Sequence, residues 1–99
     1  MQVIYHHEVE KRIRSLPRTD RARIIKVVDL FIDYQFAVTE LYLKKLTKGV
    51  WELRAGKWRM LFGMINTYAF ITVLFYKQTQ KTPKKEIELS IRRLNSYEK

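Results

Sequence analysis

The sequence predicts an α+β domain in which a short strand and two helices precede an antiparallel sheet and a third helix ends the chain. Three observations lead to this class: apolar residues at helical spacing over residues 9–32, strand-like alternation over residues 50–77, and a helix start at residues 82–83. Helices grouped ahead of hairpin-connected strands are typical of α+β folds and not of alternating βαβ units. With 99 residues and few glycines and prolines, the chain is expected to form one domain over residues 1–99.

The N-terminal elements are an apolar strand over residues 2–5 and two antiparallel helices. The first helix has one apolar stripe, made of Val9, Ile13 and Leu16. Pro17 stops this helix, and Thr19 is expected to cap the next one. The apolar positions of the second helix face a core and are Ile24, Ile25, Val28, Phe31 and Ile32. Residues 37–49 are ambiguous between a short helix and a loop, and their lysines lead basic charge toward the sheet.

Residues 50–63 show the alternation of two strands joined by a tight turn. Gly56-Lys57 suits a two-residue type II′ turn, whose register pairs Arg54 directly with Arg59. Like charges in opposed positions repel each other and destabilise a sheet. Because a guanidinium group binds phosphate or carboxylate in two-pronged fashion, the arginine pair predicts an anion-binding site.

A third strand over residues 68–77 is rich in aromatic and β-branched residues and is expected to be central, with the first strand added beside the meander. We expect the helices to cover one face of the sheet, which leaves the other face to the arginines and Glu52. Thr82-Pro83 is a good helix start, with Thr82 as N-cap. The buried stripe predicted for this last helix consists of Ile87, Ile91 and Leu94.

The register of the third strand decides which side chains lie near the arginines. A two-residue turn at Asn66-Thr67 places Arg59 opposite Leu74 and diagonal to Tyr76. The two arginines and Tyr76 then share one surface, whereas Lys77 alternates away from it and closes around the patch only from the strand end.

Charge is unevenly distributed along the chain, whose formal net charge is +10. Residues 1–43 contain seven Lys or Arg and six Asp or Glu, so their net charge is +1. Residues 44–99 contain thirteen basic and four acidic residues, so their net charge is +9. This asymmetry predicts a basic face that attracts a polyanion. Nucleic acid is the first candidate for this polyanion and an acidic protein the second. The simplest alternative is a basic surface that only keeps the protein in solution.

Several function classes are not expected from the sequence. The chain contains no cysteine, which removes disulfides and thiolate metal sites and fits a reducing cytosol. His6 and His7 are adjacent and point to opposite faces of a strand, so we expect no metal site there. The N-terminus lacks the pattern of a signal peptide. The apolar run over residues 60–76 contains polar and glycine interruptions, so it is interpreted as two strands joined by a turn and not as a membrane helix.

Three stretches carry a resemblance to a known family: Trp51-Glu52-Leu53-Arg54, Arg59-Met60-Leu61-Phe62, and the run from Phe75-Tyr76-Lys77 through Thr82-Pro83 to Leu89. They resemble the RelE/HigB toxins of bacterial and phage toxin–antitoxin systems, in particular the phage-derived HigB-like branch. The resemblance covers about half the chain. Two positions depart from the branch pattern, since Val73 stands where a histidine is frequent and Gln78 where a second lysine is frequent.

The resemblance implies a RelE-like fold and a cytoplasmic, metal-independent endoribonuclease without cofactors that cuts messenger RNA, usually in the ribosomal A site. It also implies neutralisation by a small antitoxin, commonly of the helix-turn-helix type. Two other functions stay open: a ParE-like toxin that acts on a protein target such as DNA gyrase, and a nucleic-acid-binding module without catalysis.

Metal-free RNA cleavage needs activation of a ribose 2′-OH, stabilisation of a phosphorane-like transition state, and protonation of the leaving 5′ oxygen. The predicted catalytic residues are Arg54, Arg59, Lys77 and Lys81. The two arginines match the motif positions of the family and grip the scissile phosphate, and the two lysines bind flanking phosphates or take part in proton transfer. The predicted RNA-binding residues are Lys57, Tyr76, Lys84 and Lys85. Glu52 is interpreted as a charge partner of Arg54, and the general base stays unassigned.

Overall fold

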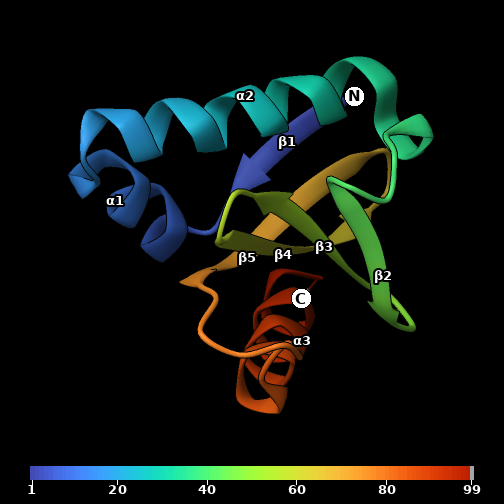
Figure 1. Cartoon of the computed structure of the whole chain (residues 1–99). Helices are drawn as coiled ribbons and strands as arrows, with labels where there is room; N and C mark the ends of the chain where they lie inside the picture. Colours follow the sequence, from blue (N-terminus) through green and yellow to red (C-terminus); the bar gives the residue numbers. More distant parts are fainter. Residues whose placement is uncertain (99) are drawn as a thin grey trace.

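The computed structural model describes residues 1–98 and shows a five-stranded sheet with helices on both faces (Figure 1). The elements in chain order are β1 (Gln2–Tyr5), α1 (His7–Ser15), α2 (Arg18–Tyr34), the 3-10 turn η1 (Gln35–Ala37), β2 (Leu43–Thr47), β3 (Val50–Ala55), β4 (Trp58–Ile65), β5 (Tyr68–Tyr76) and α3 (Lys84–Glu98). This arrangement confirms the α+β class. In the described part of the chain, no helix has both the length and the apolar character that a membrane span needs.

The strand order is β1-β5-β4-β3-β2, with β1 parallel to β5 and every other neighbouring pair antiparallel. The first strand therefore joins the sheet after the helical excursion, and β5 is central, as the sequence predicts. Both predicted two-residue turns are present, at Gly56-Lys57 and Asn66-Thr67. Gly56 and Asn66 have φ angles of 63° and 56°, a left-handed region that glycine and asparagine tolerate better than other residues.

The ambiguous stretch before the hairpin contains a fifth strand, β2, which pairs antiparallel with β3 at the edge of the sheet. Leu43 is buried opposite Leu53 and anchors the strand to the core. Lys44 and Lys45 follow it and are exposed. Leu46 packs against the core cluster on the other face of the sheet. Because two exposed lysines separate these two leucines, the sequence of this strand has no clear alternation from which it could be predicted.

A β-bulge in β5 changes the register that the turn alone predicts. The pairs Leu61–Val73 and Phe62–Ile71 flank the irregularity, so Thr72 has no partner on β4. The Thr72 hydroxyl group is fully buried, donates a hydrogen bond to the Leu61 carbonyl oxygen at 3.1 Å, and shares another with the Ser90 hydroxyl of α3 at 2.5 Å. Beyond the bulge every β5 residue is displaced by one position relative to β4.

The helices pack on both faces of the sheet, and the expectation that they cover one face is wrong. Helices α1 and α2 cover the face that bears the larger core, and α3 lies against the opposite face (Figure 1). That second face also needs cover, because four buried apolar side chains line it: Val50, Leu61, Val73 and Phe75. Helix α3 approaches closely at Gly63, where an added Cβ would lie 2.7 Å from Leu94 Cδ1 and 2.8 Å from the Gly49 carbonyl oxygen.

The apolar stripe of α3 differs from the predicted one at Ile91. That side chain is 39% exposed, whereas Leu89 packs against the second core cluster together with Ile87 and Leu94. The shift arises because α3 turns its small, fully buried Ser90 toward the bulge of β5, where Ser90 meets Thr72.

Both N-terminal helices are capped by residues that the sequence pattern did not identify as caps. Pro17 is the N-cap of α2, so Thr19 lies inside the helix and the predicted Thr19 cap is wrong. Pro17 suits this place because its own missing N–H is not required there and its carbonyl oxygen accepts from Arg21 N. His6 caps α1, with its Nδ1 accepting a hydrogen bond from Glu8 N at 3.1 Å.

The His6 cap predicts a stability that depends on pH. Burial, Arg93 and His7 lower the pKa of His6 from its usual 6.5 and outweigh the opposing effect of Glu8. Because the folded-state pKa is depressed, the neutral side chain stabilises the fold above pH 6.5, and this contribution is lost as pH falls through the lower, folded value. We expect the free energy of unfolding in urea to fall by about 0.5–1 kcal/mol, the size of a lost N-cap, as the pH is lowered from about 8 to below the folded-state pKa of His6.

The matched variant for this measurement is His6→Asn, which keeps a capping side chain that does not titrate. Its unfolding free energy should change less with pH than that of the wild-type chain over the same range. An equal pH dependence in both proteins would contradict the assignment to His6.

Candidate functional site

A cleft of about 260 Å³ opens on the α3 side of the sheet, where β2, β3 and β4 meet the end of β5 and the connection to α3. Six of its lining residues are basic and one is acidic: Lys44, Lys45, Arg54, Arg59, Lys77 and Lys81 against Glu52. Leu46, Phe75, Gln80, Thr82 and Ile87 complete the lining. This excess of positive charge makes the cleft a site for an anion.

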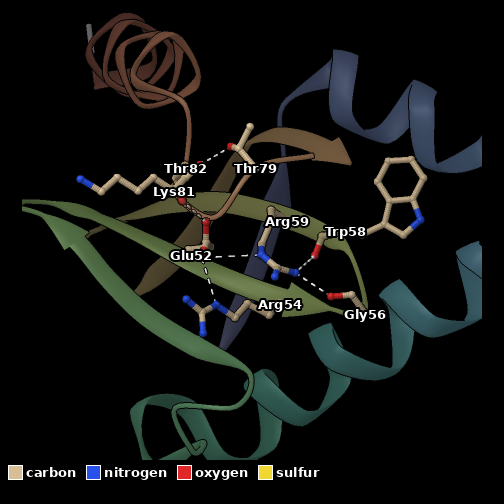
Figure 2. A network of polar contacts seen from close by, with 8 residues as sticks. All are labelled: Glu52, Arg54, Gly56, Trp58, Arg59, Thr79, Lys81 and Thr82. Carbon is tan, nitrogen blue, oxygen red and sulfur yellow. Dashed lines mark hydrogen bonds and ion pairs between the residues drawn. The ribbon is translucent and has the colours of Figure 1, made fainter. Parts of the chain in front are cut away.

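The arginine pair at the centre of the cleft is arranged as the hairpin register predicts. Arg54 on β3 lies directly opposite Arg59 on β4. The two-residue turn at Gly56-Lys57 fixes this register, and both guanidinium groups project from the same face of the hairpin (Figure 2).

Glu52 lies between the arginines and is itself almost fully buried, with 1% of its surface exposed. Its Oε1 atom accepts a hydrogen bond from Arg54 Nε at 3.1 Å and lies 3.8 Å from Arg59 Nε (Figure 2). Its Oε2 atom accepts from the Thr82 hydroxyl group at 2.5 Å. The interpretation of Glu52 as a charge partner of Arg54 is confirmed. The chain thus supplies one anion for the two arginines, and one positive charge of the pair stays uncompensated.

The two arginines differ in how freely they can contact a ligand. The Arg59 side chain is 10% exposed, and its Nη1 atom donates to the carbonyl oxygens of Gly56 at 2.6 Å and Trp58 at 3.0 Å. Burial lowers the pKa of Arg59, the Glu52 carboxylate acts in the opposite direction, and Arg54 adds to the lowering. The Arg54 side chain is 30% exposed and has Glu52 as its partner. Arg54 is therefore the more accessible donor, while Arg59 is held in a fixed orientation.

The bulge in β5 decides which C-terminal side chains reach the cleft. Arg59 lies opposite Phe75 and not opposite Leu74, so the predicted register of this strand is wrong by one residue. Phe75 and Lys77 consequently line the cleft, and the expectation that Lys77 alternates away is wrong. The Lys77 position is held by a hydrogen bond of 2.7 Å from its backbone N–H to the Lys57 carbonyl oxygen.

Tyr76 points to the opposite side of the sheet, so the shared surface predicted for it and the two arginines does not exist. It lies opposite Trp58 and contacts that ring edge to face at a centroid distance of 5.2 Å, with 47% of its surface exposed. Figure 2 shows the Trp58 indole directed away from Glu52 and the arginines. The reason is again the bulge, because the one-residue shift turns Tyr76 outward and Lys77 inward.

The residues predicted to bind RNA lie outside the cleft. Lys57 is exposed in the hairpin turn, and Lys84 and Lys85 are exposed in the first turn of α3. Neither these lysines nor Tyr76 is among the lining residues. Lys81 does line the cleft, with its side chain extending away from Glu52 and the arginines in Figure 2.

The sequence alone did not single out Lys44, Lys45 or Thr82 as site residues. Lys44 faces the cleft because it pairs with Glu52 across β2 and β3. Lys45 lies at the rim, with its Nζ atom 5.6 Å from the centroid of the Trp51 ring. Thr82 was expected to cap α3, but its hydroxyl group donates to Glu52, and the Pro83 carbonyl oxygen accepts from the first turn instead. Recognising β2 as a strand would have placed Lys44 beside Glu52.

The cleft can bind a phosphate group and offset negative charge that develops on it. The guanidinium of Arg54 offers donors that Glu52 does not use, and the lysine ammonium groups add charge around it. Glu52 is the one carboxylate among the lining residues, and both of its oxygens already accept hydrogen bonds. Within residues 1–98, no group of three or more histidines and carboxylates is placed to hold a metal ion.

Comparison with known proteins identifies one family. The model of the family described as phage derived protein Gp49-like (DUF891) matches residues 11–95, which is most of the chain. The matched range includes the whole cleft. No curated protein matches the chain.

Proposed function

The chain belongs to the Gp49-like family of phage-derived proteins, a RelE/HigB-type toxin family, and on this basis we propose that it is a ribosome-dependent endoribonuclease that cuts messenger RNA. The association of the family with toxin–antitoxin systems implies an antitoxin partner. We propose that this antitoxin is of the helix-turn-helix type, that the toxin acts in the cytoplasm, and that it needs no metal or organic cofactor.

One observation carries the ribonuclease proposal: six basic side chains and one carboxylate line a single small cleft. Cleavage of RNA by its own 2′-OH passes through a phosphorane-like transition state with more negative charge on the phosphate oxygens than the ground state has. A rigid cluster of cations binds that state more tightly than the substrate, because the donors need no reorganisation when the charge develops.

In this proposal, four basic residues of the cleft take part in the reaction. Arg54 donates to the non-bridging oxygens of the scissile phosphate, since it is the more exposed of the paired arginines. Arg59 adds positive charge from a position fixed by its hydrogen bonds to Gly56 and Trp58. Lys77 and Lys81 bind the flanking phosphates or protonate the leaving 5′ oxygen.

The residues outside the cleft extend the proposed RNA path. Lys57 lies beside the N–H of Lys77 at the hairpin turn, and Lys84 and Lys85 begin the helix that follows the cleft. We propose that these lysines contact the RNA backbone away from the scissile bond. Tyr76 would contact a base from the opposite side of β5, where nearly half of its surface is exposed.

The experiment that tests the proposal maps RNA ends in translating cells after induction of the chain. We expect new 5′ ends inside translated reading frames within minutes, and no new ends in the same transcripts when translation initiation is blocked. Growth arrest with intact messenger RNA would overturn the nuclease proposal and favour a protein target. Cleavage that persists without translation would overturn the ribosome dependence alone.

A further inference from the structure

The outer face of α2 carries a charge pattern that its own helix does not stabilise. The amino-terminal half of this face contains Arg18, Arg21 and Lys26, whereas the carboxyl-terminal half contains Asp29 and Asp33 and no base. A helix dipole favours acids at the amino end and bases at the carboxyl end, so this distribution is largely the reverse of the favourable one.

Four charged residues of this face also have no ion-pair partner among residues 1–98. No ion pair joins Arg18, Lys26, Asp29 or Asp33 to any other residue of the described part of the chain. Arg21 donates one hydrogen bond, from Nη1 to the Arg14 carbonyl oxygen at 3.2 Å, and keeps other donors free.

A shallow groove of about 570 Å³ runs along the same face, with small and apolar residues between the charged ends. Ala22 and Lys26 lie on it with Ile25, whose side chain is 38% exposed. Arg18 and Asp33 lie at equal distances from the midpoint between residues 25 and 26, about 11 Å on either side at ~1.5 Å per residue. The two charged ends of the face are therefore complementary to those of a copy turned end for end, whereas the Lys26 residues of the two copies lie side by side near the axis, so that their ammonium groups must point outward.

We propose that α2 is a self-association surface, on which a second copy of this chain packs antiparallel about a two-fold axis near Ile25 and Lys26. Each Arg18 then meets Asp33 of the other copy, and the two helix dipoles oppose each other favourably. The aliphatic stem of Lys26 covers Ile25 of the other copy at the centre.

The distribution of charge over the molecule favours this face over others for contact between two copies. Residues 1–43, which include α2, carry a net charge of +1, whereas residues 44–99 carry +9. Two copies that meet through α2 keep their basic halves apart. Because α2 and α3 lie on opposite sides of the sheet, both clefts stay open in such a pair (Figure 1).

The test is sedimentation velocity of the wild-type chain at concentrations up to about 0.5 mM, since an interface with a small apolar centre belongs to the weak class. We expect a reversible dimer that weakens as salt is raised from about 50 mM to 500 mM. Arg18→Glu and Asp33→Lys should each raise the dimer Kd at least about tenfold, because each replaces two attractive contacts by two repulsive ones.

Charge exchange distinguishes the proposed pairing from loss of folding. An equimolar mixture of the Arg18→Glu and Asp33→Lys variants should form a heterodimer, and the double variant should recover the homodimer. Both positions are exposed, and each change removes a charge that opposes the helix dipole, so monomer stability should not fall. A wild-type chain that stays monomeric at the highest concentration, or variants that dimerise like the wild type, would overturn the proposal; the first outcome leaves the groove to another partner.

Discussion

Replacement of Arg54 by alanine is expected to lower the rate of messenger RNA cleavage about 100-fold or more, the usual effect of removing one donor to a developing oxyanion. Arg54 is the more exposed arginine of the cleft and has donors that its partner Glu52 does not use. Because the side chain is partly exposed and Arg59 remains beside the buried Glu52, the substitution should cost less stability than Arg59→Ala, although Glu52 Oε1 loses a donor. The loss should therefore appear mainly in cleavage, with a small shift of the urea midpoint.

The measurement is the appearance of a defined 5′ end over time in a purified translation system. Arg92→Ala is the matched control, since it removes the same charge from an exposed position of α3 that does not line the cleft. Arg54→Lys should show an intermediate loss, because an ammonium group keeps the charge but not the two-pronged geometry. Undiminished cleavage by Arg54→Ala would remove this residue from the proposed mechanism.

Arg59→Ala should lower cleavage to a similar extent and should also destabilise the fold. Its Nη1 atom satisfies the carbonyl oxygens of Gly56 and Trp58 at the hairpin turn, and both would lose this donor. The contrast between the two alanine variants, with the larger loss of stability in Arg59→Ala, is the outcome expected from their different burial. Full stability of Arg59→Ala would contradict the positioning assigned to it.

Replacement of Glu52 by alanine is expected to lower the free energy of unfolding by about 2–3 kcal/mol, which is less than for breaking a fully buried ion pair because Arg54 is partly exposed. The buried carboxylate holds Arg54 and Thr82 by hydrogen bonds and lies beside Arg59. Without it, two opposed cations stay on neighbouring strands with no internal anion.

Urea unfolding measures this loss, with Glu88→Ala as control, an exposed acid of α3 for which a change within about 0.5 kcal/mol is expected. Glu52→Gln keeps an acceptor for Thr82 but not the charge, so its unfolding free energy should lie between those of the wild type and Glu52→Ala. Added phosphate should restore part of the stability of Glu52→Ala if an anion takes the place of the carboxylate. An unchanged urea midpoint for Glu52→Ala would contradict its role.

The features that the sequence predicts correctly depend on short-range chemistry. A two-residue turn at Gly56-Lys57 fixes the pairing of Arg54 with Arg59, because register follows from turn length. The Asn66-Thr67 turn, the two N-terminal helices and the final helix follow from equally local signals.

The features that the sequence does not predict depend on contacts between distant elements. The bulge of β5 is stabilised by Thr72, whose hydroxyl group meets Ser90 on α3, a contact between residues 18 positions apart. Thr82 is a good capping residue by type, yet its hydroxyl group is used by Glu52, 30 positions earlier. Neither choice is visible in a local pattern, and both affect which side chains line the cleft.

The bulge at Thr72 has a consequence for how this chain should be aligned with its relatives. The identity of residues 75–77 does not by itself determine which of them face the cleft, because the extra residue at the bulge also decides it. A relative of the same length without the bulge would present Tyr76 to the arginines and turn Lys77 away, whereas a relative that lacks both the bulge and one residue would keep Phe75 opposite Arg59. Placement of a gap near residue 72 is therefore as informative about a shared site as any substitution at the cleft itself.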